Sequence, residues 1–536
     1  MTYDDRDRGK KKEKAPLFEE LLAYRQRADR TFHVPGHKNG KAYVGLDGAG
    51  PLAEVMTVDV TEISGTDDLH HPEGVIKEAQ ALAANCFGAD ESYFLVGGST
   101  AGNLAMILTV CRKPGDVLLL QRNVHKSVLN GLMLAGARAV FLDPDIDAES
   151  GLPVAPSCHA LAAALAVYPE ARGVLVTMPN YYGMGINLKG IADLCHARNI
   201  PLLVDEAHGA HYGLHPDLPE NALSCGADAV VQSTHKMLAA MTMGAMLHVQ
   251  GELLDRNLLR QRLAMVQSSS PSYPVMASLD LARRLVHAQG PSAFTAGLAA
   301  VGAFKRGLAQ LPRFGLLQPP QPWGPAAGTG TAGGQVPPPQ DTAAVYTRQD
   351  PFKAVIYDRT GSLSGYGLQH ALEARGCVPE MSDERHVVLL FTLGSTEEDA
   401  NHLLWALRHI VEEEEETELL GVLNPPLTET KHNVSTWNNS GSVPPFSEPV
   451  SFSLTPAEPG DMESVAVEKC SGRIAAEMVI PYPPGIPILY PGELITNMTA
   501  ERLTALGNAG AKCQGTADRT LRNILVFKNP RKQVTK

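Results

Sequence analysis

Short apolar segments alternate with segments of helical spacing between residues 74 and 251, and this alternation constrains the fold more than any other feature. The apolar segments are rich in Val and Leu and read ESYFLV, DVLLLQ, RAVFLDP, GVLVTMP, PLLVDEA and DAVVQST. Strands buried on both faces are continuously apolar, and helical crossovers between them make them parallel. The pattern therefore predicts an α/β fold with a mostly parallel sheet, in which ligands bind at the carboxyl ends of the strands.

The chain has 536 residues, so we expect more than one domain. Pro- and Gly-rich or polar stretches suggest where the domains divide. The expected divisions are an N-terminal arm and helix at 1–30, a major α/β domain at 31–317, a linker or long loop at 318–345, a small α+β domain at 346–423, a flexible insertion at 424–465 and a C-terminal segment at 466–536.

Composition excludes several function classes. The formal net charge of −12 and the pI near 5.8 argue against a nucleic-acid partner. The 8 cysteines form no C-x-x-C pair, which disfavours a disulfide framework and favours a reducing compartment. The charged N-terminus lacks the apolar core of a secretory signal, and the longest uncharged stretch contains turn residues. We therefore expect a cytoplasmic protein with no membrane span.

Polar residues follow several of the predicted strands. After ESYFLV, the segment GGSTAGN (97–103) runs into a predicted helix. Glycines expose backbone N–H groups, a helix N-terminus attracts anions, and Ser99 and Thr100 add hydroxyl donors. This segment is a candidate phosphate cradle, although an ordinary strand-to-helix turn is the more frequent explanation of such a motif taken alone.

Three other strand ends carry an acid, a lysine and a histidine. Asp205 ends PLLVDEA, Lys236 follows DAVVQST, and His125 follows DVLLLQ. A desolvated lysine has a lowered pKa and can form an imine. An acid, a lysine, a stacking histidine and an anion cradle are what pyridoxal 5'-phosphate requires, because the acid keeps the pyridine nitrogen protonated. The combination therefore predicts this cofactor.

His208, His211 and His215 invite a metal interpretation through their spacing. Gly209 and Gly213 interrupt the segment, and no acidic ligand is spaced for a helix-borne site, so a metal hydrolase is a distant alternative. We expect no metal.

The motifs together resemble the Orn/Lys/Arg decarboxylase family of fold-type-I pyridoxal-phosphate enzymes, in particular its short Bacillus-type members. The similar segments are FHVPGHKNG (32–40), DVTEISGTDDLHHPEG (59–74), GGSTAGN (97–103), RNVHKS (122–127), LLVDEAHGAHYG (202–213), QSTHKML (232–238), SSSPSYPVMASLD (268–280) and PYPPGIPILYPGE (481–493). The chain reads Pro179-Asn180-Tyr181-Tyr182 where family members often have Thr at the second position.

The resemblance implies a role for each matching residue. It makes Lys236 the residue that carries the cofactor as an imine, with His208 and His235 as further catalytic candidates. The cofactor would be bound by Ser99, Thr100, the Ala101 backbone, His125, Asp205, His208, Ser233 and His235, and by Ser268 or Ser269 of a partner subunit. A homo-oligomer, a dimer or larger, with its site between subunits is therefore expected.

The implied reaction is α-decarboxylation of a basic amino acid to CO₂ and a di- or polyamine, with arginine favoured, then lysine, then ornithine. Asp67, Asp68 and Glu493 are candidates for binding the cationic end of the substrate, although each could equally be a solvated loop acid. The alternatives are another fold-type-I enzyme, such as an aminotransferase or Cβ lyase, or a non-catalytic relative on the same fold.

Overall fold

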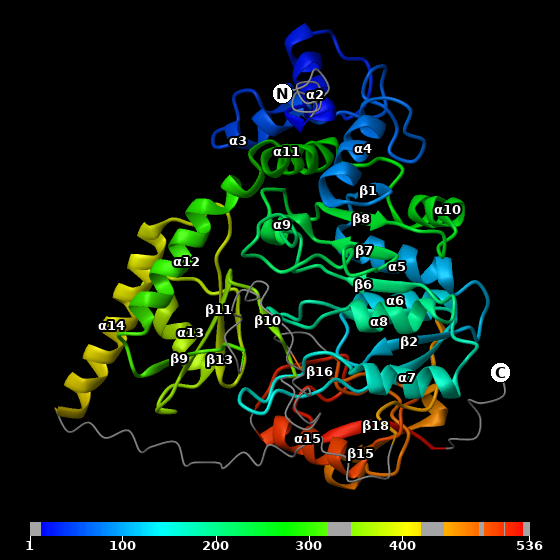
Figure 1. Cartoon of the computed structure of the whole chain (residues 1–536), viewed down its shortest axis with the longest axis vertical. Helices are drawn as coiled ribbons and strands as arrows, with labels where there is room; N and C mark the ends of the chain where they lie inside the picture. Colours follow the sequence, from blue (N-terminus) through cyan, green and yellow to red (C-terminus); the bar gives the residue numbers. More distant parts are fainter. Residues whose placement is uncertain are drawn as a thin grey trace, which may run out of the picture.

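The computed structural model describes residues 12–319, 345–419, 444–455, 457–481, 487–508 and 510–528. Its centre is an eight-stranded sheet, seen edge-on in Figure 1. The strand order is β1 (Glu91–Leu95), β8 (Ala245–Val249), β7 (Ala229–Gln232), β6 (Leu202–Asp205), β4 (Val174–Thr177), β2 (Val117–Gln121), β3 (Arg138–Leu142) and β14 (Val450–Ser451). The fold class expected from the sequence is confirmed.

The central strands β7, β6, β4, β2 and β3 are parallel. Strand β8 runs against β7 and β1, and β14 runs against β3. Helices cover both faces, as continuously apolar strands require. One face packs against α5 (Gly98–Val110), α6 (Lys126–Ala135) and α10 (Arg256–Val266), and the other against α7 (Cys158–Val167) and α8 (Lys189–His196).

The N-terminal part packs on the edge of this sheet. Helix α2 (Pro16–Arg27) lies against α4 (Val75–Phe87) and α11 (Tyr273–Gln289), with α3 (Gly50–Val55) nearby (Figure 1). Leu17 and Leu21 of α2 are fully buried in the cluster that continues along α11. The described part of the expected arm is therefore a packed helix.

A smaller unit follows α11 through α12 (Thr295–Leu308). Its antiparallel sheet has the order β12 (Met381–Ser382), β13 (His386–Leu390), β11 (Lys353–Asp358) and β9 (Phe314–Leu316). Helices α12, α13 (Gly365–Glu373) and α14 (Glu397–Leu419) pack with it, on the left of Figure 1. Strand β10 (Arg348–Gln349) pairs with β5 (Met184–Gly185), so the entry into β11 is hydrogen-bonded to the major unit.

The chain after residue 443 extends the edge of the major sheet and then forms a C-terminal unit. The described part of the expected insertion differs from a flexible segment, because Val450 and Phe452 are buried against the major sheet and β14 extends its edge. The C-terminal unit contains β15 (Met462–Ala466) paired with β18 (Asn523–Phe527), β16 (Ile480–Pro481) paired with β17 (Cys513–Gln514), and α15 (Asn497–Asn508). Of the linker or loop expected at 318–345, residues 320–344 lie outside the described residues, as do residues 424–443 of the expected insertion.

Candidate functional site

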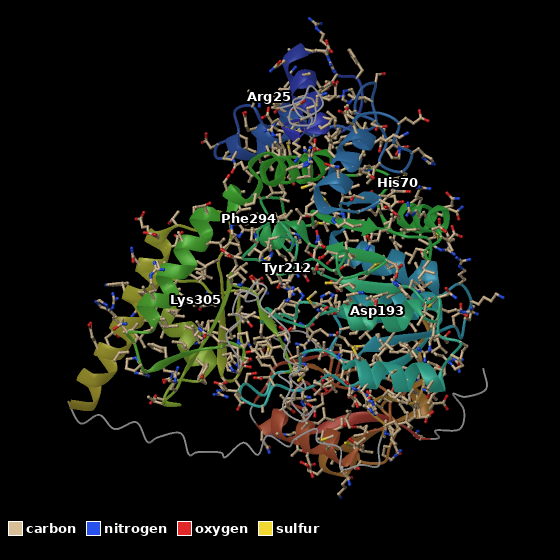
Figure 2. All side chains as sticks on the ribbon, viewed as in Figure 1. Arg25, His70, Asp193, Tyr212, Phe294 and Lys305 are labelled. Atoms are coloured by element: carbon tan, nitrogen blue, oxygen red, sulfur yellow. The ribbon has the colours of Figure 1, made fainter. Side chains whose placement is uncertain are left out.

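A partly open hollow, with an enclosed space of about 40 Å³, lies at the carboxyl ends of the parallel strands. It is lined by Ser99, Asn123, His125, Pro153, Thr177, Asn180, Tyr181, Tyr182, Asp205, Ala207, His208 and Lys236. This is the edge at which the topology of a parallel sheet places ligands. Figure 2 labels Tyr212, which follows β6 in the same part of the chain as Ala207 and His208.

The predicted anion cradle lies where the segments that follow β1 and β7 meet, and β8 separates these two strands in the sheet. Ser99 begins α5 and Ser233 follows β7, and their hydroxyl oxygens lie 2.9 Å apart. Helix α5 approaches β7 closely, since a Cβ on Gly102 would lie 2.4 Å from Val231 Cγ2. The close approach brings the first turn of α5, whose N–H groups have no intrahelical acceptor, beside both hydroxyls.

Asp205 ends β6 and is only 2% exposed. Its carboxylate accepts hydrogen bonds from Asn103 Nδ2 at 2.8 Å and from the Ala207 N–H at 3.1 Å. Both donors are neutral, and a buried carboxylate is stabilised best by a cation. Thr177 Oγ1, at the end of β4, is buried and has no hydrogen-bond partner among the described residues. These polar groups fit a bound ligand with a positive ring nitrogen.

His125 is held in place by the helix that follows it. Its Nδ1 accepts the Ser127 N–H at 3.2 Å as the cap of α6, and this fixes the orientation of the imidazole. Burial lowers the pKa of His125, so the ring is neutral at pH 7, and His125 lines the hollow.

Lys236 lies in the short helix α9 (Thr234–Met237) directly after β7. Its Nζ is 3.1 Å from His208 Nε2 and 5.6 Å from the centre of the Tyr181 ring. Burial lowers the pKa of Lys236, which increases the fraction of neutral, nucleophilic amine. Burial, reinforced by two neighbouring lysines, lowers the pKa of His208 well below its ordinary value.

Several residues of this site were not predicted from the sequence, and two of the residues without a prediction contact His208. Tyr181 packs against the His208 ring, with the ring centres 4.5 Å apart. Lys353, at the start of β11, is 1% exposed, and its Nζ lies 2.9 Å from His208 Nδ1. A lysine at the start of an apolar strand was a possible signal, but nothing in its sequence position connects it to the distant histidine.

Other predicted residues lie outside the hollow in the single chain. His235 bonds through Nδ1 to the Gly244 carbonyl at 2.9 Å, and Thr100 and Ala101 continue the first turn of α5. Ser268 is exposed, and its carbonyl is 2.9 Å from His70 Nε2. Neither Ser268 nor Ser269 lines the hollow of its own chain.

The three candidate substrate acids are engaged elsewhere in the structure. Asp67 accepts backbone N–H groups around the start of α4, including Gly74 at 2.8 Å. Asp68 accepts the His70 N–H at 2.8 Å. Glu493 forms an ion pair with Arg122. None of the three lines the hollow.

The histidine series does not gather into a metal site. His211 pairs with Asp350 at 3.0 Å, and His215 lies 3.9 Å from Asp217. In the described ranges, no group of three or more His, Cys, Asp and Glu residues could hold a metal ion. None of the described helices combines the length and apolar character needed to cross a membrane.

Comparison with solved structures identifies the class of fold. The constitutive lysine decarboxylase of E. coli superposes with a TM-score of 0.72, at 23% sequence identity, over 96% of this chain and 82% of that chain. A lysine decarboxylase of Pseudomonas aeruginosa gives the same TM-score of 0.72 over 96% of this chain and 80% of its own. The fold is therefore that of these decarboxylases.

Sequence comparison then identifies the family. The Orn/Lys/Arg decarboxylase major domain matches residues 15–399, and the C-terminal domain of the same family matches residues 455–517. An arginine decarboxylase of Bacillus subtilis is 32% identical over 96% of this chain and 98% of its own length. An uncharacterised protein of the same organism, YaaO, is 39% identical over 96% of this chain and 98% of its own length. The chain belongs to the Orn/Lys/Arg decarboxylase family, and it is an amino acid decarboxylase.

Proposed function

We propose that the chain is a cytoplasmic, pyridoxal 5'-phosphate-dependent α-decarboxylase of a basic amino acid, with arginine preferred to lysine and lysine to ornithine. The observation that carries the proposal is the convergence of Lys236, Asp205, His125 and the Ser99–Ser233 pair around one hollow. The substrate order rests on similarity to arginine decarboxylases over nearly the full chain.

The residues present fit the cofactor. The two serine hydroxyls and the first turn of α5 would hold its phosphate, Asp205 its ring nitrogen, His125 one ring face and Lys236 its aldehyde. When bound, the cofactor supplies an electron sink for the pair released as the carboxylate leaves. Ser99 and Ser233 arise from elements packed against each other, so the cradle is pre-organised.

The chain's own groups supply the proton chemistry. Lys236 lies among His208, Tyr181 and Asp205, in a site that burial makes poorly solvated. Its neutral amine can accept a proton and return it to the substrate α-carbon, with His235 and a tyrosine as alternative donors. The same poor solvation destabilises a carboxylate ground state relative to CO₂.

The second part of the proposal is a homo-oligomer with its sites between subunits. Apolar side chains between residues 32 and 55 are exposed in the single chain, including Phe32 at 93% and Val44 at 84%. Covering such a patch with a second copy would remove apolar surface from water. Ser268 and Ser269, which do not reach their own hollow, would be free to reach the partner's phosphate site.

Replacing Lys236 with Ala tests the proposal. Purified Lys236→Ala should show no imine absorbance after incubation with pyridoxal phosphate and should release no CO₂ from arginine, lysine or ornithine. Lys126→Ala is the matched control, because Lys126 also follows a histidine at a strand end but is exposed. Full activity in Lys236→Ala would refute the assignment.

Light scattering on the wild type gives the oligomeric state, and a fully active monomer would contradict the interface site.

A further inference from the structure

The His208 imidazole bridges two lysines from different units of the molecule. Lys236 Nζ lies 3.1 Å from Nε2, and Lys353 Nζ lies 2.9 Å from Nδ1. Lys353 also donates to the Tyr181 carbonyl at 2.6 Å. The side chain of Lys353 is 1% exposed, and it does not line the hollow. It lies behind His208, and no part of the proposed chemistry uses it.

The His208 imidazole carries a single ring proton, and its two neighbours determine which nitrogen holds it. Its lowered pKa makes the imidazole neutral, so one ring nitrogen carries a proton and the other a lone pair. In its protonated form Lys353 only donates, so Nδ1 then accepts from Lys353 and the ring proton lies on Nε2. That N–H is directed at Lys236 Nζ, which can accept it only as the neutral amine.

Neighbouring charged groups also influence the protonation of Lys353, His208 and Lys236. Burial lowers the pKa of Lys353 to about 7, against the opposing effect of Asp350. Asp350 Oδ1 contacts His211 Nε2 at 3.0 Å and accepts the Phe352 N–H at 3.0 Å, whereas Oδ2 is buried and has no hydrogen-bond partner among the described residues. The charged or titratable groups that act on Lys353, His208 and Lys236 are Asp205, Asp350, Glu380, His125 and His235.

We propose that Lys353 is a positioning residue that fixes the tautomer of His208 and thereby keeps the Lys236 amine unprotonated. The inference rests on the proposed function, because the amine it controls is the one expected to bind the cofactor. It also gives the small unit a role in the chemistry. The pairing of β10 with β5 places Lys353 at the site, so the position of the small unit and the protonation of Lys236 are linked.

The test is the titration of Lys236 in the full-length protein without cofactor. Acetic anhydride labels neutral amines, and mass spectrometry of the Lys236 peptide across a pH series gives the midpoint of its titration. Lys353→Met keeps the length and apolar stem but removes the donor to Nδ1. His208 can then move its proton to Nδ1 and accept from a protonated Lys236. The midpoint for Lys236 should rise by about one pH unit.

Lys305→Met is the matched control. Lys305, labelled on α12 in Figure 2, is also a lysine whose pKa burial lowers, and its Nζ bonds to the Pro351 carbonyl at 3.2 Å. It has no hydrogen bond to His208 in the described structure. The Lys236 midpoint should stay at the wild-type value in this variant, and an equal shift there would overturn the proposal.

Two further variants separate the hydrogen bond from the charge of Lys353. Lys353→Gln retains an N–H donor without the charge, and its Lys236 midpoint should lie closer to wild type than to Lys353→Met. It also serves if Lys353→Met does not fold. In a His208→Asn background, Lys353→Met should no longer shift the midpoint. An unchanged midpoint in Lys353→Met, or a full shift that persists without His208, would refute the proposal. Because no cofactor is present, these results do not depend on whether Lys236 binds it.

Discussion

Two carboxylates at different ends of the major unit, one buried and one partly buried, differ in what neutralises them. At the strand ends, Asp205 receives hydrogen bonds from two neutral donors and borders the hollow. At the junction with the C-terminal unit, Glu493 is paired with Arg122, whose Nε also donates to Asp143 at 2.9 Å. A buried acid is therefore not by itself a sign of a ligand site. The informative feature is whether the protein already supplies its cation.

The largest expected effect comes from Asp205. Asp205→Asn keeps the shape of the side chain but removes the charge that would hold a ring nitrogen protonated. Activity should fall by on the order of 100-fold or more, measured as kcat for CO₂ release. Asp228→Asn is the control, because Asp228 is also buried in this sheet but accepts the Leu202 N–H at 2.8 Å away from the hollow. It should lose stability and keep kcat. Equal losses of kcat in both variants would remove the distinction.

The strand-end half of the site was predictable because sequence order sets it. Each polar residue ends an apolar strand or follows it within a few residues, and parallel strands bring their carboxyl ends to one edge. Ser99, His125, Asp205 and Lys236 all border the hollow, as expected from that rule. Their roles toward a cofactor remain proposals.

The remainder depended on contacts that leave no local pattern. Glu493 and Arg122 are 371 positions apart, so their pairing is a property of how the C-terminal unit docks. Lys353 reaches His208 across 145 positions from another sheet. The addition of β14 to the major sheet was also hidden, because two buried residues, Val450 and Phe452, lie in an otherwise polar segment. Tertiary packing decides such cases.

An effect of intermediate size, on stability, is expected at the junction between the major unit and the C-terminal unit. Glu493→Gln leaves the Arg122 guanidinium in a partly buried position with a weaker partner, beside the Tyr490 ring that stacks on Phe141 at 4.3 Å. The free energy of unfolding should fall by about 2 kcal/mol, because the partly buried Arg122 loses one charged partner and keeps only Asp143. The measurement is urea denaturation.

The Michaelis constant of Glu493→Gln tests whether Glu493 binds the cationic end of the substrate. If Glu493 serves the junction, KM for the preferred amino acid should stay at the wild-type value. Asp143→Asn is the matched control, since it removes the other carboxylate that Arg122 contacts. A large rise in KM in Glu493→Gln alone, with stability kept, would make Glu493 a substrate residue and would join the two regions functionally.

The smallest expected effect is at Asp67. Its carboxylate accepts the N–H groups of Asp68, Glu73, Gly74, Ile76 and Lys77 at 2.8 to 3.3 Å. Burial opposes ionisation, but these donors outweigh it and lower the pKa of Asp67 below its ordinary 3.8. Asp67 has a φ of +68°, which asparagine also tolerates. Asp67→Asn should therefore lose only the charge-assisted part of the cap, about 1 kcal/mol at pH 7.

The pH dependence gives the sign of this effect. A carboxylate whose pKa is lower in the folded protein stabilises the fold above pH 3.8, and the stabilisation is lost as the pH falls through the lower, folded value. The difference in unfolding free energy between wild type and Asp67→Asn should shrink in acid. Asp68→Asn should cost less, because among the described residues the Asp68 carboxylate contacts only the His70 N–H and His71. If Asp67→Asn instead keeps its stability and raises KM, Asp67 binds the substrate. The distinction between acids that bind backbone N–H groups and acids that border the hollow would then fail.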